Sequence, residues 1–127
     1  GYTADDFDWS RQQGFRVVQA EACWHRSLGP LLEEVREQLG GGPAYLSFDS
    51  DGLDPADAPG TGTPEIGGLT SAQGIEVIRG CRGLDLVGCD LVEVAPAYDL
   101  SGNTSLIAAN LLFEMLCVLP GVEGRQG

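Results

Sequence analysis

The chain has 127 residues with 19 acidic and 7 basic side chains, which gives a formal charge of −12. This acid excess argues against a nucleic-acid-binding surface, which needs clustered lysine and arginine, and against binding to anionic lipid surfaces. The sequence has no lysine, which excludes Schiff-base chemistry and Walker-type phosphate loops within this chain. Because the only methionine is Met115 and the first residue is Gly1, we expect a piece of a longer or processed protein.

The polar and acidic N-terminal residues contain no apolar segment typical of a signal peptide. The most apolar segment, 106–119, is interrupted by Asn110 and Glu114 and is too short to span a bilayer. We therefore expect a buried helix there and no membrane partner. Because none of the four cysteines forms a CxxC pair, we expect reduced thiols in an intracellular compartment.

Hydrophobic periodicity predicts strands that alternate with helices along the chain. In chain order these elements are a strand over 15–18, a helix over 27–39, a strand over 44–48, a helix beginning after Thr70, a strand over 84–94 and a helix over 106–119. Thr70 and Gln73 have the spacing of a capping box, and a long loop rich in proline and glycine covers 52–69. This alternation is typical of one α/β domain in which helices flank a parallel sheet. Ligands of such sheets bind at the carboxyl ends of the strands.

Two carboxylates, Asp49 and Asp51, follow the apolar strand over 44–48. Residues two apart on a strand point to the same face, so we expect these side chains to project together. Two neighbouring carboxylates repel each other unless a positive charge lies between them, and a hard divalent cation is the simplest such partner. The alternative is that one forms an Asx turn while the other is solvated. An EF-hand is excluded, because Gly60 stands where that loop needs a glutamate.

A third carboxylate, Glu93, is placed by the same pattern inside the apolar strand over 84–94. A buried glutamate needs a cation, and either an arginine of the protein or a bound guanidinium would pair with it bidentately. Asp90 faces the other side of this strand, so we expect a structural role for it. The single histidine, His25, has no further cysteine or histidine at zinc-site spacing, so we do not expect it to bind a metal.

These carboxylates belong to longer motifs. The run 47–55 reads SFDSDGLDP, 58–69 reads APGTGTPEIGGL and 88–99 reads GCDLVEVAPAYD. Together the motifs resemble the signature of the ureohydrolase family, which comprises arginase, agmatinase and related guanidino-compound hydrolases. They are most similar to the agmatinase branch, and the resemblance extends over residues 14–120.

The resemblance implies an α/β fold in which this chain is the C-terminal part of the arginase-like three-layer arrangement. It also implies a binuclear manganese site that activates a hydroxide for attack on a guanidinium carbon, releasing urea and an amine. In the family's pattern Asp49 bridges both metals, Asp51 binds one of them and Glu93 orients the guanidinium. The implied substrate is agmatine or a guanidino acid.

The family's other metal ligands come from a GGDH segment and a DxHxD segment, and neither occurs in residues 1–127. The usual catalytic histidine is missing as well. We therefore expect a partial ureohydrolase domain without a complete catalytic set, inactive alone and weak in manganese binding. By the resemblance, we expect the full-length form to be a homo-oligomer, mitochondrial or otherwise cytoplasmic. Ser50 stands where family members usually have Ile or Val, and an unpaired buried hydroxyl there would cost about 1–3 kcal/mol.

Two alternatives remain at this point. FDSDG also resembles the nucleophile motif of haloacid-dehalogenase-type phosphatases, but that chemistry needs a downstream lysine, which this chain lacks. The second alternative is a non-catalytic ureohydrolase remnant that acts as a structural or interaction subunit. Its sheet would then have an exposed edge able to pair with another chain.

Overall fold

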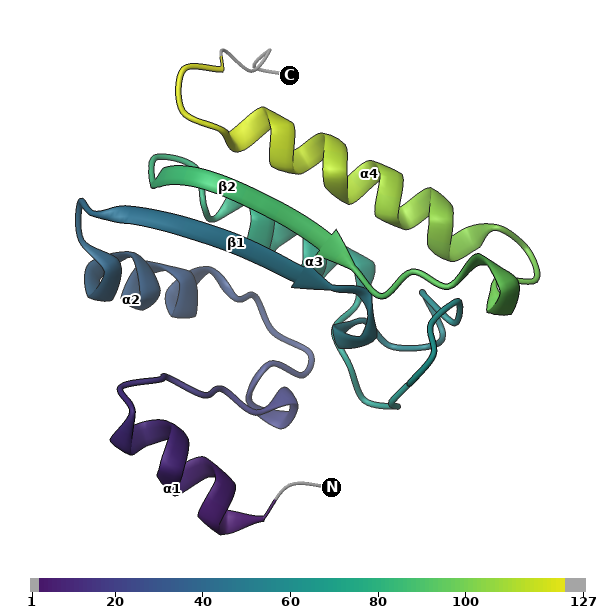
Figure 1. The fold of residues 1–127 in the computed structure, drawn as a ribbon, viewed down its shortest axis with the longest axis horizontal. Coiled ribbons are helices and arrows are strands. Elements are labelled where there is room, and N and C mark those ends of the chain that lie inside the picture. The colour runs from purple at the N-terminus through teal and green to yellow at the C-terminus, as the bar shows by residue number, and fades with distance from the viewer. Residues whose placement is uncertain (1–2, 123–127) are drawn as a thin grey trace.

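A pair of parallel strands with helices packed against it forms the centre of the chain. The computed structural model describes residues 3–122. Its helices and strands are α1 (Ala4–Gln12), α2 (Gly29–Leu39), β1 (Pro43–Asp49), α3 (Ser71–Arg79), β2 (Asp85–Val92) and α4 (Asn103–Val118), as Figure 1 shows. Short 3₁₀ turns cover Ala20–Ala22, Ser50–Gly52 and Pro96–Tyr98.

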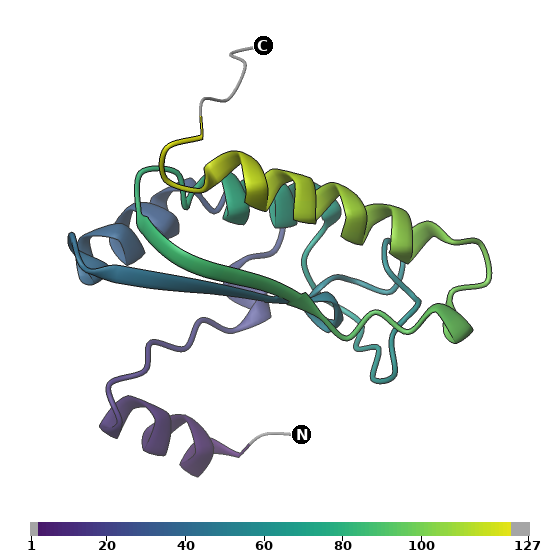
Figure 2. The same cartoon turned by 45° about the horizontal axis from the view of Figure 1, so that its top comes forward.

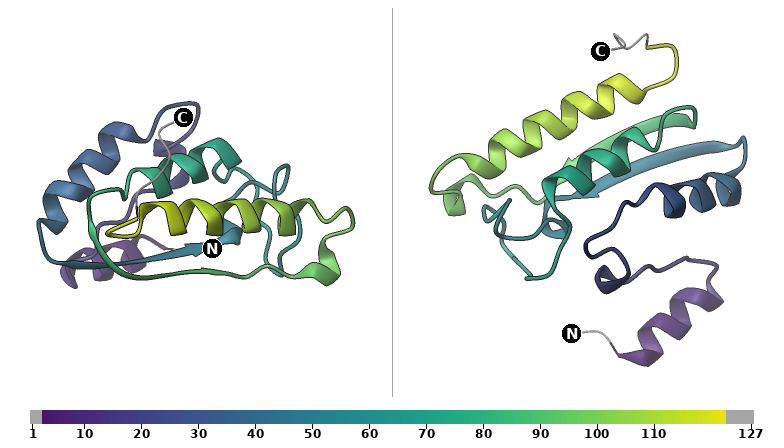
Figure 3. Two further views of the ribbon diagram at one scale, coloured as in Figure 1. Left: turned by 90° about the horizontal axis from the view of Figure 1, so that it is seen from above. Right: turned by 180° about the vertical axis from the view of Figure 1, so that it is seen from behind.

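The two strands run parallel, with Pro43 opposite Asp85 at one end and Asp49 opposite Val92 at the other. Because α3 makes the crossover connection, both strands end at the same edge of the sheet. Helices α2, α3 and α4 lie on one face (Figures 2 and 3). Side chains of the opposite face remain accessible, and Tyr45 and Val87 are 61% and 67% exposed.

The hydrophobic core lies between the sheet and the helices. Apolar side chains from β1, the following loop, α3, β2 and α4 meet there and are almost completely buried, among them Phe48, Leu53, Ile78, Leu86, Leu111 and Met115. A bidentate ion pair joins α3 to α4: the Arg79 guanidinium donates to both carboxylate oxygens of Glu114, at 2.9 and 2.8 Å. This packing fixes where β1 and β2 end relative to the start of α4.

The predicted α/β arrangement, a parallel sheet with flanking helices, is confirmed. The capping box of α3 is also confirmed: the Gln73 N–H donates to the Thr70 hydroxyl, and the Thr70 N–H donates to the Gln73 side chain, both at 3.1 Å. Helix α4 begins at Asn103, earlier than predicted. The Asp99 carboxylate accepts the N–H groups of Thr104 and Ser105, which satisfies this early helix start.

One prediction about the N-terminal part was wrong, and one helix there was not predicted. Residues 15–18 form no strand, because within residues 3–122 the sheet contains β1 and β2 and no neighbour pairs with this segment. In contrast, helix α1 was not predicted from its polar sequence. Its start carries a capping box in which the Thr3 N–H donates to the Asp6 carboxylate at 2.7 Å. Figure 1 shows α1 lying apart from the sheet.

The cysteines of the chain form no disulfide bond. All four cysteines are free thiols, and Cys23 and Cys81 are buried. Burial raises the pKa of the Cys81 thiol. Among the described residues, no helix has both the length and the apolar character needed to cross a membrane.

Candidate metal and guanidinium site

The carboxylates predicted from the sequence lie at the edge where both strands end. Asp49 is the last residue of β1, Asp51 lies in the 3₁₀ turn Ser50–Gly52, and Glu93 directly follows β2. Because Asp49 pairs with Val92 in the sheet, Glu93 is one residue beyond the paired end of β2. Asp51 lies outside β1, so its position comes from the turn and not from the strand alternation that we expected.

Asp49 stabilises this turn. Its exposed side chain accepts the Asp51 N–H at 2.8 Å through Oδ1, which caps the 3₁₀ turn. This is the Asx-type contact that the sequence left open as an alternative. Only one carboxylate oxygen is used by this bond, so the contact leaves an acceptor at the end of the strand.

Asp51 is held differently and is not simply solvated. Its Oδ2 accepts a hydrogen bond from the Thr63 hydroxyl, while Oδ1 is buried with no hydrogen-bond partner among the described residues. A buried carboxylate oxygen without a partner is unfavourable unless a donor or a cation meets it. Two carboxylates with one such oxygen are suitable ligands for a hard divalent cation. The residues present therefore fit a metal, as part of its ligand set.

Ser50, between these aspartates, is 2% exposed and its hydroxyl also lacks a hydrogen-bond partner among the described residues. The expected unpaired buried hydroxyl is therefore found. Its side chain is buried although Asp49 and Asp51 on either side are more accessible.

Asp54 organises the long loop that follows. Its carboxylate accepts the N–H groups of Ala56 at 2.8 Å and Gly67 at 2.9 Å, and its own N–H donates to the Leu69 carbonyl at 2.8 Å. The hydrogen bonds that the carboxylate accepts, from Ala56 first and then from Gly67, lower the pKa of Asp54. This role of Asp54 was not predicted, although an aspartate before a proline is a recognised turn signal.

The same loop is hydrogen-bonded to the segment that follows β2 and to α4. Gly60 donates its N–H to the Thr104 hydroxyl and accepts the Ala95 N–H at its carbonyl, both at 2.8 Å. The Asn103 side chain donates to the Asp57 carbonyl at 2.6 Å. The loop over 52–69 therefore has a defined position, although its sequence contains no periodic pattern.

The position of Glu93 differs from the one predicted. The predicted strand over 84–94 stops at Val92, and Glu93 is exposed, so it is not a carboxylate buried in a strand. Its backbone has φ = 70°, in the left-handed region that residues other than glycine rarely adopt. Such backbone strain of about 1–3 kcal/mol is concentrated at functional sites.

Asp90 takes part in a separate contact on the accessible face of the sheet. It accepts hydrogen bonds from the Ser47 hydroxyl at 2.7 Å and the Tyr45 hydroxyl at 2.8 Å. The bond from Ser47, followed by that from Tyr45, lowers the pKa of Asp90, and the bond to Asp90 raises the pKa of Tyr45. The contact ties β1 to β2, which agrees with the structural role predicted for Asp90.

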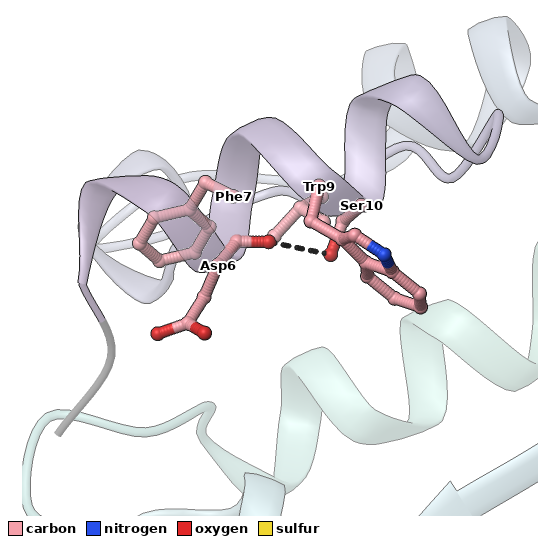
Figure 4. Close-up of a pocket in the computed structure, with 5 residues that line it drawn as sticks. Asp6, Phe7, Trp9 and Ser10 are labelled. Atoms are coloured by element: carbon pink, nitrogen blue, oxygen red, sulfur yellow. Dashed lines mark hydrogen bonds between the residues drawn. The ribbon is translucent and has the colours of Figure 1, made fainter.

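A pocket beside α1 lies away from these carboxylates (Figure 4). It is lined by Asp6, Phe7, Trp9, Ser10 and Val17. The Asp6 carboxylate already accepts hydrogen bonds from Thr3, and the Ser10 hydroxyl donates to the Asp6 carbonyl at 3.0 Å. We assign no chemistry to this pocket.

The comparisons with known proteins agree with the motifs at the strand ends. The model of the arginase family matches residues 1–117. The chain belongs to the arginase family. Guanidinobutyrase of Pseudomonas aeruginosa is 76% identical over 125 residues, which are 98% of this chain and 39% of that protein. The mitochondrial guanidino acid hydrolase of Homo sapiens is 68% identical over 120 residues, covering 94% of this chain and 34% of that protein.

Solved structures show the same arginase-family fold. A hypothetical agmatinase from Burkholderia thailandensis superposes with a TM-score of 0.81 at 44% identity, over 93% of this chain and 35% of that one. Proclavaminate amidino hydrolase from Streptomyces clavuligerus gives a TM-score of 0.83 at 41% identity, over 90% and 38% of the two chains. This arginase-family chain thus spans 34–39% of the length of these relatives.

The described part of this arginase-family chain contains no complete group of metal ligands. Within residues 3–122, no three His, Cys, Asp or Glu side chains are grouped so that they could hold a metal ion. His25 is exposed in the segment between the turn Ala20–Ala22 and α2. Asp49 and Asp51 are therefore the residues on which a metal proposal depends.

Proposed function

We propose that this chain is the C-terminal portion of an arginase-family hydrolase that cleaves a guanidino compound to urea and an amine with bound manganese. The family match and the relatives' names support the reaction class. The observation that carries the metal assignment is the buried Oδ1 of Asp51, in the turn that directly follows β1, which has no hydrogen-bond partner in the part of the chain that the structure describes.

In this proposal Asp49 and Asp51 are the two metal ligands that this chain contributes. Both supply hard carboxylate oxygens, which suit manganese. A metal bound there would supply a water-derived nucleophile at neutral pH, which a weakly electrophilic guanidinium carbon requires. The Asp51 N–H to Asp49 bond and the hydrogen-bonded loop beyond it keep the two side chains in fixed positions.

Glu93 is the proposed contact for the substrate guanidinium. It is exposed at the same edge of the sheet, where a ligand can reach it. A carboxylate accepts two parallel N–H groups from a guanidinium, which gives both orientation and affinity. The left-handed backbone at Glu93 supports this role, because strained residues persist where function requires their position.

The favoured substrate class is a guanidino acid. Guanidinobutyrase, guanidinopropionase and the mitochondrial guanidino acid hydrolases are among the most similar relatives, whereas a chicken relative is named as a mitochondrial agmatinase. A guanidino acid has an anionic tail and agmatine a cationic one, so the two are separable in an assay. A mitochondrial location and a homo-oligomeric full-length form stay predictions.

The test is urea release from 4-guanidinobutyrate and from agmatine, with excess manganese. We expect the longer protein that contains this segment to release urea, with 4-guanidinobutyrate preferred. Asp51→Asn and Glu93→Gln should each reduce that turnover strongly, and Asp85→Asn, at the far end of β2, should leave it unchanged. The isolated chain should release no urea, because it supplies only two of the metal ligands that the reaction requires. Turnover by the isolated chain near that of the longer protein would contradict this proposal.

The alternative, a non-catalytic interaction subunit, is favoured by one observation. The face of the sheet that carries Tyr45 and Val87 is accessible, whereas the faces of parallel sheets are normally covered. The same assay separates the two functions, because an interaction subunit predicts no turnover by the longer protein with either substrate.

A further inference from the structure

The strongest unassigned feature near the strand ends is the contact between the loop over 52–69 and Asp51. Thr63, twelve residues after Asp51, donates its hydroxyl to Asp51 Oδ2. The other oxygen, Oδ1, is buried without a hydrogen-bond partner among the described residues. The two oxygens of one carboxylate are thus differentiated: one accepts a protein hydrogen bond and one has none.

On this observation, and on the function proposed above, we propose that Thr63 is a positioning residue for a cation-binding Asp51. A free carboxylate rotates about its side-chain bonds and can present either oxygen. The hydroxyl contact restricts this rotation and so orients the carboxylate for the cation. Hydrogen bonds of this kind to ligating carboxylates orient them, and their removal typically lowers metal affinity by about 10–100-fold.

The loop is held firmly enough for Thr63 to act in this way. The Asp54 carboxylate accepts the Gly67 N–H on the far side of Thr63, and Gly60 is bonded to both Thr104 and Ala95 on the near side. Thr63 therefore lies between two anchored points of the loop. Its hydroxyl is presented by a segment that is itself attached to α4 and to the end of β2.

A competing explanation makes the opposite prediction. If the Thr63 hydroxyl only occupied an oxygen that a cation would otherwise take, then its removal would free Asp51 and strengthen cation binding. Positioning predicts that removal weakens binding. The sign of the change in manganese affinity therefore decides between the two explanations.

The experiment is a manganese titration of the isotopically labelled chain, followed by paramagnetic broadening of its amide NMR signals. Site-selective broadening over residues 49–52 gives an apparent Kd that does not depend on turnover. Asp51→Asn should abolish this broadening, and Asp85→Asn, an exposed carboxylate at the other end of β2, should not change it. The Asp85 variant controls for general attraction of manganese to a chain of charge −12.

Thr63→Val keeps the size of the side chain and removes the hydroxyl, and we expect its apparent Kd to rise about tenfold. Thr63→Ser keeps the hydroxyl and should restore an affinity within about threefold of wild type. Thr63→Ala also removes the hydroxyl and replaces the valine variant if valine disturbs the loop. The spread of the amide signals reports whether each variant is folded. A serine variant as weak as the valine variant would show that the loop conformation, not the hydroxyl, matters.

The outcomes for Thr63 and for the proposed function are separable. Selective broadening in the wild type with an unchanged or lower Kd in Thr63→Val would overturn the positioning role and leave the metal assignment standing. No selective broadening in the wild type, or broadening that Asp51→Asn does not remove, would overturn the metal assignment and the role of Thr63 with it.

Discussion

At the scale of single residues, the site is defined by polar groups whose hydrogen bonding is incomplete. Asp51 Oδ1 and the Ser50 hydroxyl, which belong to adjacent residues, are both buried with no hydrogen-bond partner within residues 3–122. The two have different explanations. A cation can satisfy the carboxylate oxygen of Asp51. For the Ser50 hydroxyl we propose no ligand.

Removing the Ser50 hydroxyl should therefore stabilise the chain. Ser50→Ala takes away a buried polar group without adding volume, and we expect the free energy of unfolding to rise by about 1 kcal/mol. Urea denaturation of the purified chain measures this change. Ser101→Ala, on an exposed residue, serves as the control and should stay within about 0.5 kcal/mol of wild type. A loss of stability in Ser50→Ala would show that the hydroxyl is satisfied in solution.

The left-handed backbone at Glu93 gives a second prediction at this scale. Glycine adopts φ = 70° without the steric cost that a β-carbon imposes, so Glu93→Gly should be more stable than Glu93→Ala by about 1 kcal/mol. Both variants lack the carboxylate, so their comparison isolates the backbone. Equal thermal and urea stability of the two would mean that the residue does not keep this conformation in solution.

At the scale of elements, the strands and most helices could be predicted because their apolar residues recur at regular spacing. The prediction of a strand over 15–18 was wrong, because an apolar run becomes a strand only with a hydrogen-bonded neighbour. Sequence periodicity does not reveal whether such a neighbour exists. The arrangement around Asp51 was also beyond prediction. Its partner Thr63 comes from an irregular loop whose path depends on Asp54 and Thr104.

Close packing between that loop and α4 requires glycine at position 60. A β-carbon on Gly60 would lie 2.5 Å from Cβ of Asp99 and 2.9 Å from the Thr104 hydroxyl. We expect Gly60→Ala to lower the free energy of unfolding by about 1–3 kcal/mol. Gly62→Ala is the matched control in the same loop, because a β-carbon there meets nothing within 4 Å. Equal stability of the two variants in urea would contradict the packing of the loop on α4.

The start of α4 should also make stability depend on pH through Asp99. The Ser105 N–H first, then the Thr104 N–H and the Ser105 hydroxyl, hold the pKa of Asp99 below its usual value in the folded chain. A folded-state pKa below the unfolded value stabilises the fold above the unfolded pKa, and this contribution is lost as pH falls through the lower folded value.

Asp99→Asn should accordingly be less stable than wild type at pH 7. The difference between the two should shrink as pH falls below about 4, where Asp99 becomes protonated in the unfolded chain, and should be lost as pH falls through the lower pKa of the folded chain. Chemical denaturation across this range measures it. A difference that stays constant with pH would show that the Asp99 charge does not contribute through these bonds.

At the scale of the whole molecule, the chain carries an arginase-family fold over about a third of its relatives' length, with three carboxylates at one sheet edge. The sequence motifs predict Asp49, Asp51 and Glu93 as site residues, and the parallel sheet brings all three to that edge. Their roles stay proposals. The central claim is that the unpartnered oxygen of Asp51 is a metal ligand.

The measurement that tests this claim most directly is the anomalous scattering of manganese in crystals of the chain soaked in manganese chloride. The account predicts an anomalous peak in contact with Asp51 Oδ1 and close to the Asp49 carboxylate, absent from crystals of Asp51→Asn. Peaks found only at other carboxylates, with none at Asp51, would contradict it.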